Sequence, residues 1–73
     1  MFVTIYGRSG CAYCVKAKNY CKVNGIKYCY LPYNDETKEV LQKELETLPR
    51  TLPIVFVNDT FIGGYNELEQ YFK

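Results

Sequence analysis

The chain has 73 residues, which is enough for one small domain, and 48% of them are hydrophobic, too many for a disordered chain. Nine basic residues nearly balance eight acidic ones, and a net charge of +1 gives no basis for binding nucleic acid or a membrane surface. No apolar run approaches the ~20 residues that cross a bilayer, and the residues after Met1 do not resemble a signal peptide. We therefore expect one cytoplasmic domain, residues 1–73, with no nucleic-acid or membrane partner.

Hydrophobic periodicity divides the chain into seven elements in the order β-α-β-α-β-β-α. β-branched and aromatic residues cluster in four expected strands, at residues 2–6, 26–31, 54–57 and 60–62. Helices are expected at about residues 11–24, between Asn34 and Pro49, and after residue 64. The first two strands should be parallel, whereas the last two form an antiparallel hairpin turned at Asn58 and Asp59. This order predicts an α/β fold with helices on both faces of a four-stranded mixed sheet.

Each expected helix has one apolar face, formed by Cys14, Ala17 and Cys21 in the first, Leu41, Leu45 and Leu48 in the second, and Leu68, Tyr71 and Phe72 in the last. Gly25 is suited to end the first helix in the left-handed conformation. Asn34 is suited to cap the second.

The segment Cys11-Ala12-Tyr13-Cys14 follows a strand and a glycine turn and opens a helix. At a helix start, unpaired backbone N–H groups and the positive end of the dipole favour an anion. A thiolate at Cys11 would be stabilised there, which lowers its pKa from ~8.5, and Arg8 adds a positive charge before the helix. Cys14 lies one turn further, within reach of the Cys11 sulfur but pointing more toward the interior. We therefore expect a redox-active disulfide in which Cys11 attacks and Cys14 resolves.

A zinc site is the competing explanation for the cysteines. Zinc favours four ligands, however, and this chain has one Cys-x-x-Cys pair and no His, so we expect no bound metal. Cys21 lies two helical turns, ~10.8 Å, beyond Cys14, too far for a disulfide. Cys21 and Cys29 are expected to be packing residues. A regulatory or intermolecular disulfide through either is the alternative.

Two further segments carry weaker signals. Thr51-Leu52-Pro53 stands directly before the third strand, and an ordinary trans peptide is expected there because only ~5% of X–Pro bonds are cis. Gly63-Gly64 allows close backbone approach, and the N–H groups that follow are able to bind a carboxylate. A plain strand-to-helix turn explains the glycine pair equally well.

Together these segments resemble the glutaredoxins over nearly the whole chain. Residues 6–14 are similar to the active-site segment of the dithiol members, which read Cys-Pro-Tyr-Cys. Residues 51–53 resemble their Thr-Val-Pro motif, whose proline is cis and faces the active-site sulfur. Residues 63–68 resemble the segment that holds the γ-glutamyl end of glutathione, and the short length is typical of bacterial or phage-encoded members. The resemblance implies a thioredoxin-like fold with a glutathione groove.

By position, the resemblance implies that nine residues bind glutathione: Arg8, Tyr13, Thr51, Leu52, Pro53, Gly64, Tyr65, Asn66 and Glu67. The first two would meet its glycine end, residues 51–52 its cysteinyl backbone, and residues 64–67 its γ-glutamyl carboxylate and amine. The sequence departs from the family at Ala12, where proline is usual, and at Asn66-Glu67, where many members have Asp, or Thr or Ser followed by Asp. Proline stiffens a first helical position, so Ala12 is expected to loosen this turn and to shift the redox potential.

The implied activity is reduction of protein disulfides and glutathione mixed disulfides, with glutathione as co-substrate. The implied partners are glutathione and disulfide-containing or glutathionylated proteins, with ribonucleotide reductase as one suggested client, and we expect a monomer. A first alternative is a redoxin fed by thioredoxin reductase. Thioredoxins usually carry Trp before Cys-Gly-Pro-Cys, whereas this chain has Gly10 there and no Trp. A second is a carrier of a [2Fe–2S] cluster held by Cys11-type thiolates and two glutathiones.

Overall fold

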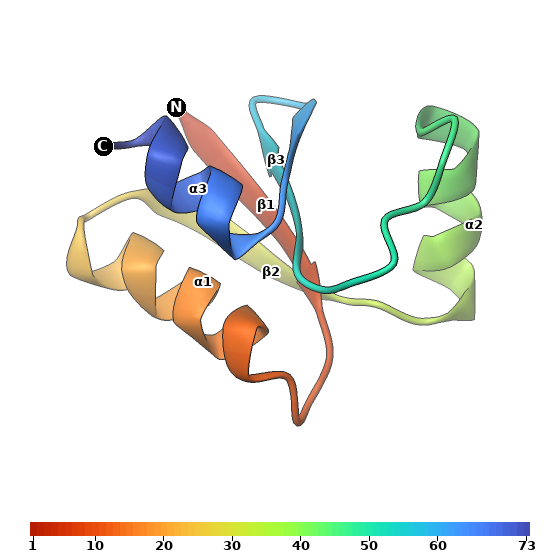
Figure 1. Cartoon of the computed structure of the whole chain (residues 1–73), viewed down its shortest axis with the longest axis horizontal. Helices are drawn as coiled ribbons and strands as arrows, with labels where there is room; N and C mark the ends of the chain where they lie inside the picture. Colours follow the sequence, from red (N-terminus) through yellow and green to blue (C-terminus); the bar gives the residue numbers. More distant parts are fainter.

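The computed structural model describes all residues from Met1 to Lys73 (Figure 1). Its elements are β1 (Phe2–Gly7), α1 (Ala12–Val23), β2 (Lys27–Pro32), α2 (Asp35–Glu44), β3 (Ile54–Val57), β4 (Thr60–Gly63) and α3 (Tyr65–Tyr71). The strands form one sheet in the order β2-β1-β3-β4. β1 pairs with β2 in parallel and with β3 antiparallel, and β3 pairs antiparallel with β4. The predicted element order and mixed sheet are confirmed.

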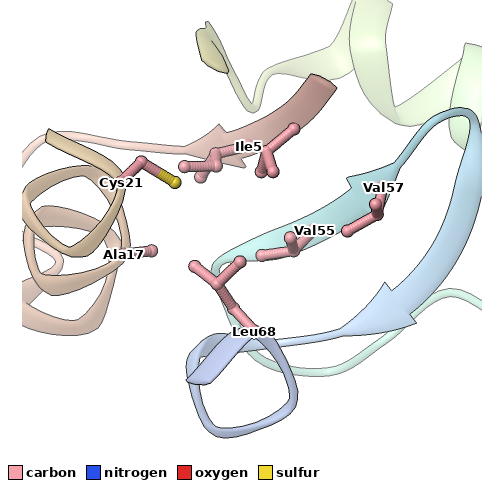
Figure 2. Close-up of a cluster of buried hydrophobic side chains, with 7 residues drawn as sticks. Ile5, Ala17, Cys21, Val55, Val57 and Leu68 are labelled. Carbon is pink, nitrogen blue, oxygen red and sulfur yellow. The ribbon is translucent and has the colours of Figure 1, made fainter. Parts of the chain in front are cut away.

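Alternating side chains in β1 and β3 divide the interior into two clusters, because successive residues of a strand point to opposite faces of its sheet. On one face, seven buried residues form the larger cluster: Val3, Ile5, Ala17, Cys21, Val55, Val57 and Leu68. Figure 2 shows Ala17 and Cys21 of α1 and Leu68 of α3 pointing toward the side chains of the two strands. The predicted apolar stripe of α1 is confirmed, since Cys14, Ala17 and Cys21 are all fully buried.

The other face of the sheet carries the smaller cluster, in which Leu41 of α2 packs with Ile54 and Phe56 of β3. The prediction that α2 continues to Pro49 is wrong, because the helix ends at Glu44 and its C-cap, Leu45, has extended backbone. Proline disfavours helical backbone in the residue before it, which limits any helix here. A loop runs back from α2 to β3 (Figure 1), and Leu45 and Leu48 pack against this cluster from that loop.

The ends of several elements follow from their capping and turn residues. Asn34 caps α2 as predicted: its Oδ1 accepts a hydrogen bond from the Thr37 N–H at 3.0 Å, and the Thr37 hydroxyl accepts one from the Asn34 N–H at 2.8 Å. Gly25 follows α1 with a φ of +65°. Asn58 and Asp59 have φ values of 48° and 71°, the paired positive values that a two-residue type I′ hairpin turn requires.

The C-terminal helix differs from its expected pattern at one residue. Leu68 is fully buried and Phe72 packs against the larger cluster, but Tyr71 is 49% exposed and does not share their face. The rings of Tyr71 and Phe72 instead meet in an edge-to-face arrangement, with 5.1 Å between the ring centroids. None of the three helices has the length and apolar character needed to span a bilayer.

Candidate active site

Cys11 and Cys14 stand where β1 passes through a short turn into α1. Cys11 is the N-cap of the helix, with extended backbone, and its sulfur accepts a hydrogen bond from the Cys14 N–H at 3.2 Å. The two residues form a disulfide, with 5.2 Å between their Cα atoms. The helix start therefore holds both sulfurs together and directs a backbone donor at the first, an arrangement that favours a thiolate there.

The two sulfurs differ in exposure. Cys14 belongs to the buried stripe of α1 and is completely inaccessible, whereas Cys11 is half-buried. A substrate sulfur approaching from solvent meets Cys11 first. This asymmetry agrees with the predicted division between an attacking and a resolving cysteine.

Gly7 belongs to the site, although the sequence indicated only a turn at this position. It is the last residue of β1 and is buried. A Cβ placed on Gly7 would lie 2.8 Å from the Cys14 sulfur and would also collide with the Tyr30 hydroxyl. Only glycine at this position leaves room for the side chains of Cys14 and Tyr30, which lie over this end of the strand. A glycine at the end of a buried strand was the available signal, since it often marks close approach by another group.

The segment before β3 lies beside the exposed sulfur. The Leu52 carbonyl oxygen is 3.9 Å from the Cys11 Sγ, and the Leu52–Pro53 peptide is cis. The trans expectation from proline statistics is therefore wrong here, and the cis bond implied by the family resemblance is confirmed. Pro53 is buried at the start of the strand.

The structure gathers the nine predicted glutathione-binding residues around Cys11. Eight of them line one cavity of about 270 Å³: Tyr13, Thr51, Leu52, Pro53, Gly64, Tyr65, Asn66 and Glu67. The ninth, Arg8, lines an adjoining cavity of about 290 Å³ together with Ser9, Gly10 and Cys11. Thr51 and Leu52 belong to both cavities. The two cavities thus form a groove with Cys11 in one part and the glycine-pair segment in the other.

Charged groups lie at both parts of this groove. Arg8 is exposed, with its guanidinium 5.9 Å from the centre of the Tyr33 ring. In the other part, one oxygen of the Glu67 carboxylate accepts a hydrogen bond from the Gly64 N–H at 2.7 Å. This bond fixes the carboxylate beside the cavity.

Tyr13 and Tyr65 contribute an aromatic pair to the lining of the groove, and Lys16, which the sequence did not indicate, lies beside both rings. The rings of Tyr13 and Tyr65 are 6.0 Å apart. The Lys16 ammonium is 5.2 Å from the centre of the first ring and 5.8 Å from the second. The Tyr65 hydroxyl donates a hydrogen bond to Glu69 at 3.3 Å, and burial together with this carboxylate raises the pKa of Tyr65.

The other two cysteines lie outside the groove and are unpaired. Cys21 is fully buried in the larger cluster, and burial raises the pKa of its thiol, so the predicted packing role is confirmed. Cys29 is half-buried in β2, with its sulfur 3.9 Å from the Thr4 hydroxyl. A larger cavity of about 390 Å³ lies on the α2 side of the sheet, and no cysteine lines it.

Comparison with known proteins agrees with this geometry. Residues 3–62 match the Glutaredoxin family model. The chain is 38% identical to the glutaredoxin of Vibrio cholerae, over its whole length and 92% of that protein. The structure of reduced Escherichia coli glutaredoxin superposes with a TM-score of 0.79 at 36% identity, covering 97% of this chain and 92% of that one.

A buckwheat glutaredoxin–glutathione complex superposes with a TM-score of 0.77 at 22% identity, covering 96% of this chain and 66% of that one, which shows a shared fold. Because the likeness in sequence and structure extends along nearly the entire chain, the chain belongs to the glutaredoxin family and is a thiol–disulfide oxidoreductase of thioredoxin-like fold.

Proposed function

We propose that this glutaredoxin reduces protein disulfides and glutathione mixed disulfides with electrons from glutathione. The observation that carries the proposal is the groove beside Cys11, lined by the residues that the family resemblance assigns to glutathione. Glutathione has a carboxylate at its glycine end and both a carboxylate and an ammonium at its γ-glutamyl end. Arg8 suits the first carboxylate, and Glu67 suits the ammonium.

The middle of the groove supports the same orientation. Thr51 and Leu52 line both cavities, and the Leu52 carbonyl oxygen lies 3.9 Å from the Cys11 sulfur. An extended peptide that pairs with this backbone would bring its own cysteine sulfur close to Cys11. The proposed pairing thus brings the two reacting sulfurs together.

In the proposed reaction with a glutathionylated protein, the Cys11 thiolate attacks the glutathione sulfur of the mixed disulfide. The new bond joins Cys11 to glutathione, and the protein sulfur leaves with the electron pair of the broken bond and takes up a proton. A second glutathione thiolate then attacks the glutathione sulfur held on Cys11. Oxidised glutathione leaves and the Cys11 thiolate returns.

With a protein disulfide, the first attack joins Cys11 to one protein sulfur and frees the other. Cys14 then attacks Cys11, forms the disulfide seen in the structure and releases the reduced protein. Two glutathiones reopen that disulfide in turn. The fully buried position of Cys14 supports this order, because a bulky substrate reaches Cys11 but not Cys14.

The proposed setting is the cytoplasm, where reduced glutathione is the abundant thiol and structural disulfides rarely persist. The proposed clients are glutathionylated and disulfide-containing proteins, with ribonucleotide reductase as a candidate. We propose a monomer that carries no metal.

The electron donor tests the proposal. Reduction of a small glutathione mixed disulfide is measured with glutathione, glutathione reductase and NADPH, and separately with thioredoxin reductase and NADPH. We expect turnover only with the first system. Turnover only with the second would instead identify a redoxin fed by thioredoxin reductase.

A further inference from the structure

The resolving sulfur has a polar neighbour that is not part of the glutathione groove. The point where a Cβ would stand on Gly7 is 2.8 Å from the Cys14 sulfur and closer still to the Tyr30 hydroxyl oxygen. The Tyr30 hydroxyl oxygen and the Cys14 sulfur both lie within 2.8 Å of this one point, so the two atoms are close neighbours. Both lie over the end of β1, on the face of the sheet that α1 covers.

The register of the sheet explains how Tyr30 reaches this position. Tyr30 of β2 pairs with Ile5 of β1. Ile5 belongs to the larger cluster beneath α1, and Tyr30 packs against that cluster. Since Gly7 stands two residues beyond Ile5, it points to the same face and leaves that face open. The long tyrosine side chain extends along the strand into the space that Gly7 provides.

This part of the interior has few means of stabilising a negative charge. Cys14 is completely inaccessible to water, and an unsolvated thiolate is costly unless it is hydrogen-bonded or faces a positive charge. Tyr30 brings a hydroxyl, and the Lys18 ammonium lies 5.0 Å from the centre of its ring. Lys18 stands one helical turn beyond Cys14 in α1, so the cation approaches the Tyr30 ring from a different element than the one that carries the hydroxyl.

We propose that the Tyr30 hydroxyl donates a hydrogen bond to the Cys14 thiolate in the dithiol reaction. When a glutathione thiolate attacks Cys11, the bond between the two cysteine sulfurs breaks and its electron pair passes to Cys14. The hydroxyl stabilises this leaving thiolate before it takes up a proton. In the opposite direction, the same bond holds the Cys14 thiolate as it attacks Cys11 and displaces the substrate sulfur. The inference rests on the proposed dithiol function, because the reaction of a glutathionylated protein does not use Cys14.

Tyr30→Phe tests the proposal, with Tyr28→Phe as the matched control. Tyr28 lies two residues earlier in β2 and packs against the same cluster, so the control removes an identical hydroxyl from the same strand face. Two rates are measured: reduction of a protein disulfide, and opening of the Cys11–Cys14 disulfide by glutathione. We expect Tyr30→Phe to slow both by about 10-fold, the effect of one hydrogen bond to a charged group, and Tyr28→Phe to leave both nearly unchanged.

The same substitution in a Cys14→Ser background separates this role from a structural one. Reduction of a glutathione mixed disulfide by Cys14→Ser and by Cys14→Ser with Tyr30→Phe should proceed at equal rates. A general loss of structure would slow both reactions, whereas loss of the hydrogen bond slows only the dithiol one. Equal dithiol rates for Tyr30→Phe and Tyr28→Phe would overturn the role of Tyr30 alone. If Cys14→Ser reduced protein disulfides as fast as the unmodified protein, the dithiol function itself would be wrong.

Discussion

The backbone N–H of Cys14 donates a hydrogen bond to the sulfur of Cys11 at 3.2 Å, so the second cysteine of the pair supplies a donor to the sulfur of the first. The bond forms because Cys11 is the N-cap of α1 and Cys14 stands at its third helical position. The donor belongs to the backbone, so replacing the Cys14 side chain keeps it. The reactivity of Cys11 is therefore separable from the presence of a second thiol.

Serine substitutions at the two cysteines should give different losses. Cys14→Ser keeps the N–H donor and should retain reduction of glutathione mixed disulfides while losing reduction of protein disulfides. Cys11→Ser removes the attacking sulfur and should abolish both. Steady-state rates with the two substrates check this. Equal losses in the two variants would show that the cysteines do not divide the reaction as described.

Neutralising the charges of the groove should weaken glutathione recognition. Glu67→Gln keeps an oxygen that accepts the hydrogen bond from the Gly64 N–H, so the start of α3 is retained while the negative charge is lost. We expect this variant and Arg8→Gln each to raise the KM for a glutathione mixed disulfide by roughly 2- to 5-fold, as is typical of exposed ion pairs. Lys22→Gln, on the exposed side of α1, is the control. A KM that stays the same in both groove variants would count against this binding mode.

Gly7→Ala should destabilise the fold, because its Cβ would lie 2.8 Å from the Cys14 sulfur and against the Tyr30 hydroxyl. Overpacking of this kind costs about 1–3 kcal/mol. Gly64→Ala is the comparison, since its Cβ would come no nearer than 3.4 Å to the Pro53 carbonyl oxygen. Urea unfolding of the oxidised proteins measures the difference. A Gly7→Ala variant as stable as Gly64→Ala would mean that the interior has more room than described.

Cys21 should make the protein less stable in alkali. Burial raises the pKa of its thiol above that of an exposed cysteine, so the folded chain keeps a proton that the unfolded chain releases. The contribution of the Cys21 thiol to the free energy of unfolding is fully present below about pH 9, and it is lost as the pH rises above that toward the folded-state pKa. Tyr6 and Tyr65, whose pKa values are also raised, add to the loss above their ordinary 10.0.

The test compares the pH dependence of unfolding in the unmodified protein and in Cys21→Val, with the Cys11–Cys14 disulfide intact in both. Between pH 9 and 10 the free energy of unfolding should fall less steeply in the variant. Parallel curves would show that the Cys21 thiol does not titrate differently in the two states.

The sequence predicts most of the framework because the framework depends on local patterns. Strand β3 matches residue for residue, and the Asn34 cap and the Asn58-Asp59 turn each follow from a residue with one strong conformational preference. The end of α2 was not predictable in this way. Leu45 and Leu48 fit a helical stripe, but they lie in the loop after α2, where they pack against the cluster that contains Ile54 and Phe56 of β3.

The residues of the site also differ in whether a local sequence pattern indicates them. Cys11 and Cys14 were predictable because the motif lies within one helical turn, and the groove residues because a family resemblance related distant segments to one another. The approach of Tyr30 to Cys14 over Gly7 depends on the register of two strands and a helix. No local pattern carries that information.

Mass spectrometry of a trapped intermediate tests the central claim most directly. Reduced Cys14→Ser is mixed with oxidised glutathione, and the modified peptide is identified before and after addition of reduced glutathione. We expect one glutathione on Cys11, removed by the second step, and none on Cys21 or Cys29. An adduct found mainly on Cys29, or a Cys11 adduct that reduced glutathione does not release, would contradict the account.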